Sequence, residues 1–269
     1  MVWINQNLLY IIWVLSLVIS VVLFFVLCRL NPKARRKRIV ALGFTAAFIL
    51  AFRIVFFTIR GYFEGGTDLM WRQFIFSLPG HLCGVSSIII PIAILTKKTF
   101  LLNYTYFIAL PASLFAIMLN SSVGVTSFVS DLDTYIFWVP HLMYVIVPIY
   151  LIAFEGVRPS IKSIPKILLT LIIILTIAHI VNISATWFFQ DYVVNYMYTM
   201  GPGDFINAVG DGLGERQFHI IGFLEVFWNL LPVDYIYMLL LLPLVVLVCF
   251  VMYIPLYVLK CLSKRGESL

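Results

Sequence analysis

The sequence predicts an all-α integral membrane protein with seven transmembrane helices, an N-terminus outside and a C-terminus in the cytoplasm. Hydrophobic residues make up 62% of the 269 positions and charged residues only 11%, whereas a soluble domain carries about 25% charged residues. Seven apolar runs have roughly the 20 residues that a helix needs to cross a bilayer core. The distribution of basic residues between these runs sets the orientation.

The predicted spans form a single polytopic domain that covers residues 1–269. They lie at about residues 8–28, 39–59, 79–96, 100–119, 135–154, 167–189 and 235–259, and residues 190–234 form an extracytoplasmic segment. No positive charge precedes the first run and no small-residue cleavage site follows it, so we expect it to remain as a helix rather than to be removed as a signal peptide. A loop with Gly61, Gly65 and Gly66 is expected between the second and third runs.

Basic residues gather on one side of the predicted membrane. Most of the 18 lysine and arginine residues lie at 29–38, 97–98, 158–166 and 260–265, whereas most of the 12 acidic residues lie in the alternate loops. The positive-inside rule places the basic loops in the cytoplasm. The net charge of +6 is thus explained by anchors beside anionic lipid headgroups, and a nucleic-acid partner is not expected.

A polar stretch opens the third apolar run, at residues 78–87. His81 and Cys83 follow Pro79 and Gly80 here, where the chain enters the membrane. The count of spans places His141 at a similar depth, His219 on the same side and His179 deeper. Because ionisable groups in a membrane are costly and usually face a polar interior, these residues predict a pocket that opens outward.

Each of these residues also has a structural interpretation. Cys83 can serve as a small hydrophobic side chain, and His141 can hydrogen-bond between helices. His81 lies two residues from Cys83, roughly 200° around a helix, so His141 or His219 is a better partner for a Cys–His pair. Arg53 can pair with an acid or reach a headgroup, and Asn182 can bond between helices in the same way.

No metal or cofactor site is predicted. Asp131 and Asp133 have the spacing of a metal-binding pair, but no further ligands accompany them. The glycines at 210–214 lack the lysine of a phosphate-binding loop. The cysteines, which are neither a disulfide framework nor a zinc signature, are Cys28, Cys83, Cys249 and Cys261.

Three motifs carry a resemblance to a known family: His81-Leu-Cys83, the stretch from His141 to Leu151, and the stretch from Asn195 to Pro202. In order and spacing they resemble the transmembrane protein 164 / YwaF-like family. The resemblance implies a seven-helix membrane protein and, in the animal branch, an acyltransferase that moves a fatty acyl chain between phospholipids through a cysteine.

Carried over, the resemblance makes Cys83 the acyl-accepting nucleophile. His81 would line the pocket or polarise the thiol, and His141 would be a pocket histidine. The family's histidine near the last span has one counterpart, His219, whose flanking residues differ. With this assignment the catalytic candidates are Cys83, His81, His141 and His219, and the substrate-binding candidates are Asn195, Asn182, Arg53 and Tyr196.

Two functions are compatible with these residues. The first is a lipid acyltransferase of the cell membrane that uses membrane phospholipids and needs no cofactor. The second is a transporter or a lipid- or solute-binding membrane protein whose polar side chains line an outer-leaflet pocket. No internal repeat relates two halves of the chain, as it does in many carriers, which argues against transport. The resemblance is the main reason to favour the enzyme.

Overall fold

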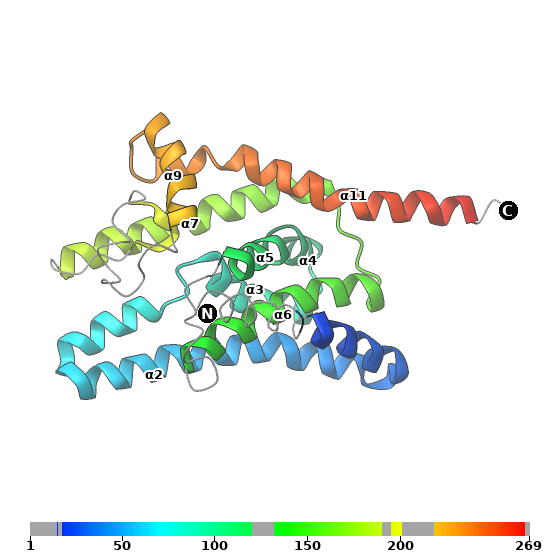
Figure 1. The fold of residues 1–269 in the computed structure, drawn as a ribbon, viewed down its shortest axis with the longest axis horizontal. Coiled ribbons are helices and arrows are strands. Elements are labelled where there is room, and N and C mark those ends of the chain that lie inside the picture. The colour runs from blue at the N-terminus through cyan, green and yellow to red at the C-terminus, as the bar shows by residue number, and fades with distance from the viewer. Residues whose placement is uncertain (1–14, 16–17, 120–131, 190–194, 201–217, 267–269) are drawn as a thin grey trace, which may run out of the picture.

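The computed structural model describes residues 15, 18–119, 132–189, 195–200 and 218–266, and all regular secondary structure in these residues is helical (Figure 1). Two shorter apolar helices cover Val18–Leu30 and Leu82–Thr96. Within the same residues, five helical stretches are long and apolar enough to cross a membrane, and these are Pro32–Ser77, Thr99–Ile117, Tyr135–Phe154, Ile161–Phe188 and Ile236–Val258. The predicted all-helical membrane protein is therefore confirmed.

The longest helix, α2 (Arg35–Ser77), is a hairpin of two helical arms. It follows the 3₁₀ turn η1 (Pro32–Ala34), and its backbone leaves the helical region only at Gly65 and Gly66, where Gly66 has φ of 71°. The second arm folds back on the first, so that a Cβ at Gly61 would lie 2.8 Å from the Leu69 carbonyl oxygen (Figure 1). The prediction of a loop at these glycines is therefore wrong. Two glycines suffice to reverse the direction of the chain between two helical arms that pack closely.

The central bundle packs α3 (Leu82–Thr96) and α6 (Leu132–Phe154) against α2. The fourth run forms α4 (Thr99–Tyr104), a π-helical turn η2 (Thr105–Ala109) and α5 (Leu110–Leu119), and Pro111 is the second residue of α5. A proline lacks the amide that continues the helical ladder, and a π-turn is a common way to absorb the break. The largest side chains buried in this bundle include Tyr104, Phe107, Tyr144 and Tyr150.

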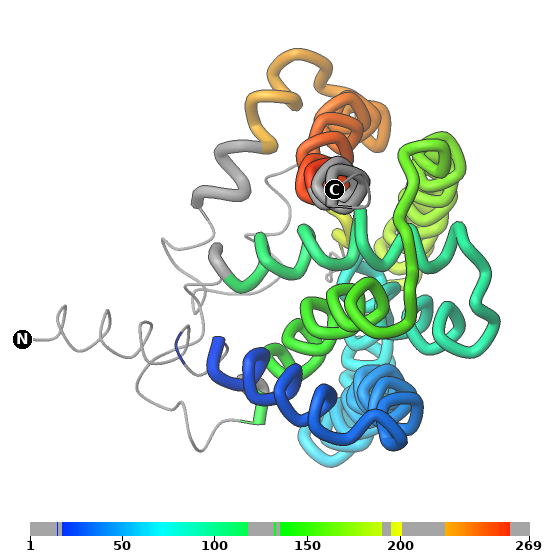
Figure 2. The backbone as a smooth tube through the Cα atoms, turned by 90° about the vertical axis from the view of Figure 1, so that its right-hand side faces the viewer, coloured from blue at the N-terminus to red at the C-terminus, as the bar shows by residue number. Residues whose placement is uncertain are grey.

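A second layer lies over this bundle, with α7 and α11 side by side (Figure 1). Seen from the end where α11 finishes, α2, α7 and α11 run nearly along the line of sight (Figure 2). Apolar residues of this second layer, such as Ile177 and Leu247, are exposed, as on a surface that faces lipid. Its elements are η3 (Ile161–Ser163), α7 (Ile164–Phe188), η4 (Tyr196–Tyr198), α9 (Phe218–Leu230), α10 (Ile236–Leu239) and α11 (Leu242–Gly266).

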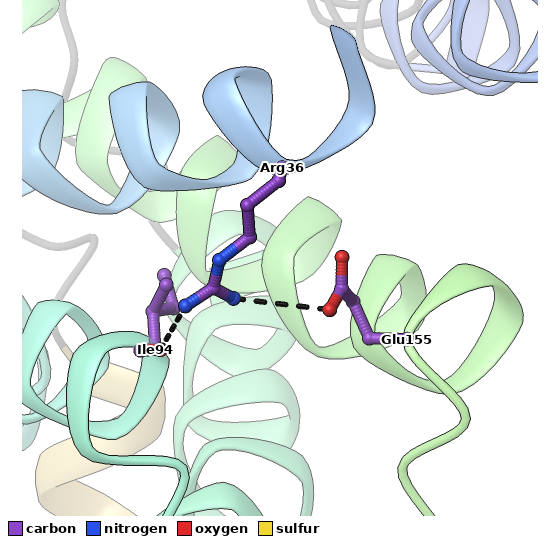
Figure 3. Close-up of polar contacts among 3 residues, drawn as sticks. All are labelled: Arg36, Ile94 and Glu155. Atoms are coloured by element: carbon purple, nitrogen blue, oxygen red, sulfur yellow. Dashed lines mark hydrogen bonds and ion pairs between the residues drawn. The ribbon is translucent and has the colours of Figure 1, made fainter. Parts of the chain in front are cut away.

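Arginines close the end of the bundle where α3 and α6 finish. Arg36 of α2 donates from Nη2 to the Ile94 carbonyl at 2.8 Å and lies 3.8 Å from a Glu155 carboxylate oxygen (Figure 3). Arg35 and Arg38 donate to carbonyls at the end of the helix Val18–Leu30, at 2.8 and 2.7 Å. Cations at helix C-termini satisfy carbonyls that have no intrahelical partner.

Candidate functional site

A cavity of about 330 Å³ lies between α2, α3 and α6. Such a volume falls at the lower end of the range for ligand pockets, about 300–1,000 Å³. Most of its wall is apolar, and the residues that line it are Ile49, Leu50, Arg53, Phe57, Phe76, Cys83, Gly84, Ser87, Ile136, Phe137, Pro140, His141 and Tyr144. The polar part of the wall therefore brings together a thiol, an imidazole, a guanidinium and two hydroxyl groups.

Cys83 is the second residue of α3, half-buried in the wall of the cavity. The chain turns tightly before it, since a Cβ at Gly84 would lie 2.7 Å from the Pro79 Cα. Cys28, Cys83 and Cys249 are all free thiols, but Cys28 and Cys249 are fully buried in the hydrophobic core. Among these three, the cavity reaches Cys83 alone.

His141 of α6 also lines the cavity, and only 4% of it is exposed. Its Nδ1 lies 2.6 Å from the Phe137 carbonyl oxygen, and its ring stacks on the Phe137 ring at 4.1 Å. A carbonyl accepts hydrogen bonds, so Nδ1 carries the proton and Nε2 is left with a lone pair. This Nε2 atom is buried and has no hydrogen-bond partner, so no other protein group engages its lone pair.

Arg53, in the first arm of α2, also lines the cavity. Its Nη2 donates to the Phe76 carbonyl of the second arm at 3.3 Å, and its Cζ lies 5.9 Å from the centre of the Phe76 ring. The acid partner considered from the sequence is not found, because the ion pairs of the described residues join Arg36, Arg60 and Arg72 to carboxylates.

Sequence reasoning missed Tyr144 and Ser87, whose hydroxyl groups share a hydrogen bond across the cavity wall. Ser87 lies one helical turn after Cys83, and Tyr144 lies three residues after His141. Residues at i+3 and i+4 share a helix face. That spacing from the two candidate catalytic residues was the signal that could have identified them.

The other proposed site residues form a separate polar network around residues 195–200. Asn182 of α7 donates to the Tyr196 carbonyl and to Thr199 Oγ1, both at 2.9 Å, and accepts from the Tyr196 amide at 2.8 Å. The Asn195 side chain accepts from the Met200 amide at 3.1 Å. The Tyr196 hydroxyl donates to the Ile75 carbonyl. These contacts fasten the segment to α7 and α2.

His81 belongs to this network rather than to the cavity. It occupies the N-cap position of α3, and its Nδ1 accepts from the Met197 amide at 3.4 Å. Its ring contacts those of Tyr196 and Tyr198, with centroids 5.5 and 6.1 Å apart. Burial raises the pKa of Tyr198, which keeps its hydroxyl protonated.

Two histidines remain. His179, expected deeper in the membrane, also reaches the 195–200 segment, with Nδ1 3.2 Å from Thr199 Oγ1. His219 is the second residue of α9, but its side chain lies outside the described part of the chain, as do the paired acids Asp131 and Asp133. Within the described residues no three His, Cys, Asp or Glu side chains lie close enough to hold a metal ion.

Comparison with known proteins identifies one family. The model of the TMEM164 family matches residues 3–254, which is nearly the whole chain and ends within α11. No curated protein and no solved structure matches the chain significantly.

Proposed function

The chain belongs to the TMEM164 family, and from the chemistry of its cavity we propose that it is a membrane-embedded acyltransferase. It moves a fatty acyl chain between phospholipids through a thioester on Cys83. The observation that carries the proposal is that one cavity is lined both by the half-buried Cys83 and by His141, whose Nε2 makes no hydrogen bond. A nucleophile and a base that share a site are the signature of covalent catalysis.

In the first half of the reaction, His141 Nε2 takes the proton of the Cys83 thiol. The thiolate attacks the ester carbonyl carbon of the donor phospholipid and forms a tetrahedral intermediate. When the intermediate collapses, the carbon–oxygen bond to the glycerol breaks, and the leaving oxygen takes the proton back from His141. The products are a lysophospholipid and the acyl thioester of Cys83.

The second half reverses these steps with another lipid. The hydroxyl group of an acceptor lysophospholipid gives its proton to His141, and its oxygen attacks the thioester carbonyl. The carbon–sulfur bond breaks, and the Cys83 thiolate recovers the proton. In both halves the Tyr144 hydroxyl, when Ser87 donates to its oxygen, is free to donate to the oxyanion of the intermediate, as preorganised donors do in other acyl transfers.

We further infer seven membrane spans and the orientation predicted from the sequence, in the cell membrane. The shorter apolar helices Val18–Leu30 and Leu82–Thr96 add two spans to the five longer ones. The start of α2 and the ends of α6 and α11 all lie toward the same end of the molecule (Figure 1). The inference is supported by this common basic end, because positive charges gather in the cytoplasm.

Intact-protein mass spectrometry after incubation with mixed phospholipids tests the mechanism. Wild type is expected to carry a hydroxylamine-sensitive acyl mass that Cys83→Ala lacks and that the control Cys249→Ala keeps. His141→Ala should slow adduct formation by about 10²–10⁴-fold, the typical contribution of a general base. His81→Ala should retain the adduct, since His81 does not line the cavity.

An acyl adduct that persists in Cys83→Ala would contradict the assignment. The absence of any adduct on wild type, together with unchanged lipid composition, would instead favour the transporter or binding function. If His219→Ala loses the adduct while His141→Ala keeps it, the base would instead be His219, in the second layer of helices.

A further inference from the structure

Arg53 is the charged residue of the cavity that the acyl-transfer steps leave unused. Among the described residues that line the cavity, no carboxylate accompanies it, and the lining histidine needs no positive charge to act as a base. The wall therefore carries a net positive charge in a setting where an isolated charge is costly. A cavity of this kind is complementary to an anion.

The contacts of Arg53 leave most of its hydrogen-bonding capacity available. A guanidinium has five N–H donors in a fixed fork, and one of them reaches the Phe76 carbonyl at a long 3.3 Å. The Phe76 ring lies 5.9 Å from Cζ, which packs the side chain without using a donor. The free edge of the fork matches the oxygen geometry of a phosphate group.

We propose that Arg53 binds the anionic phosphodiester of the lipid substrate and makes the site selective for phosphate-bearing lipids over neutral glycerides. This inference rests on the proposed function and specifies its substrate. Arg53 and Cys83 line one cavity, so a phosphate held by Arg53 brings the neighbouring ester of the same lipid toward the thiol.

The rest of the wall fits this arrangement. Ile49, Leu50 and Phe57 lie one turn before and after Arg53 on α2 and give the cavity an apolar side. A volume of about 330 Å³ holds the ester region of a lipid and the first part of a chain, and the remaining chains stay among the membrane lipids. Arg53 is thus a specificity-determining residue, and Cys83 and His141 carry the chemistry.

The test compares two acyl donors with identical chains, phosphatidylcholine and diacylglycerol, in the thioester assay with the full-length protein. Arg53→Gln should weaken the reaction with phosphatidylcholine by about 10- to 100-fold, the usual effect of a hydrogen-bonded charge, mainly through KM. Its reaction with diacylglycerol should match that of wild type. Arg53→Lys should keep part of the preference. Arg72→Gln is the matched control, since Arg72 lies on the same helix and pairs with Asp68 outside the cavity.

Equal losses with both donors would overturn the inference, because the arginine would then act on the sulfur or the reacting carbonyl. The inference would also be overturned if Arg53→Gln reacted as fast as wild type with both donors. Thermal unfolding of each variant shows whether Arg53→Gln is folded. If it is not, Arg53→Lys is compared with wild type on the two donors instead.

A binding measurement separates this inference from the acyltransferase proposal. A dialkyl, ether-linked phosphatidylcholine keeps the phosphodiester but offers no ester to attack. It should slow maleimide labelling of Cys83 in wild type and in Arg72→Gln, but not in Arg53→Gln, whether or not the protein transfers acyl chains. Inorganic phosphate should leave the labelling rate unchanged. Protection by inorganic phosphate without protection by the ether lipid would assign the site to a free anion and refute the inference.

Discussion

Replacement of Asn182 by leucine tests whether the network around residues 195–200 is structural or binds substrate. Asn182 is fully buried on α7, and its side chain makes three hydrogen bonds to Tyr196 and Thr199. Leucine is of similar size but can make none of them. The amide and the carbonyl of Tyr196 and the Thr199 hydroxyl would each lose a partner.

The expected cost follows from the number of bonds. Hydrogen bonds between helices in a membrane protein contribute about 0.6 kcal/mol each on average, so the three bonds together are worth about 2 kcal/mol. A buried polar group without any partner can cost about 1–3 kcal/mol, which makes this a lower bound. We therefore expect the free energy of unfolding of Asn182→Leu to fall by at least about 2 kcal/mol.

Reversible denaturation in detergent micelles measures this change directly, with unfolding followed by labelling of Cys249, which is fully buried in the folded protein. Thr170→Val is a matched control, because Thr170 is only half-buried on the same helix and bonds to the Lys166 carbonyl one turn back. Its unfolding free energy should stay within about 0.5 kcal/mol of wild type. An Asn182→Leu protein with wild-type stability but a raised KM for lipid would refute the structural assignment and restore Asn182 as a substrate-binding residue.

Further substitutions probe three other contacts. Gly80→Ala should cost about 1–3 kcal/mol in the same denaturation assay, because a Cβ at Gly80 would lie 2.1 Å from Tyr196 Cγ; a neutral effect would show that the segment does not pack there. Glu155→Gln should cost less than about 1 kcal/mol, since its ion pair with Arg36 is 3.8 Å long and partly exposed, whereas Arg36→Gln also loses the bond to the Ile94 carbonyl and should cost more; the reverse order would contradict that ranking. Tyr144→Phe should lower kcat for acyl transfer about 10²-fold if its hydroxyl meets the oxyanion, while Tyr150→Phe, whose buried hydroxyl has no partner and lies outside the cavity, should not.

The sequence predicted the class of fold because apolar runs report directly on the solvent around a helix. It could not predict how one run ends and the next begins. At Gly61, Gly65 and Gly66 the residue types favour a loop, yet the chain stays helical on both sides of a two-residue break. The chain stays helical because the two arms of α2 pack closely against each other. That packing depends on contacts between the arms, which residue types alone do not reveal.

The candidate site shows the same limit. Depth in the membrane can be counted along each run, so Cys83 and His141 could be placed at a common level. Whether they face each other depends on the rotation of α3 and α6 about their axes, which only their packing sets. The 200° separation of His81 from Cys83 assumes that both residues are helical, whereas His81 is the extended N-cap residue of α3. The structure turns His81 toward Met197, and it does not line the cavity.

The two polar groups of the protein differ in how completely their members are paired, and that difference separates support from function. Around residues 195–200 the described side chains of the network bond to the backbone or to other side chains, and several of these bonds join the segment to α7 and α2, so these residues hold the chain in place. Around the cavity, His141 Nε2 has no partner and most donors of Arg53 have none. Unpaired polar atoms in a membrane protein are costly, and a lone buried hydroxyl such as that of Tyr150 shows that the cost alone does not define a site. The proposed site is distinguished by the combination of groups that line one cavity: an imidazole and a guanidinium with unused hydrogen-bonding atoms, and a half-buried thiol. A single lipid ester with its phosphate would satisfy all three.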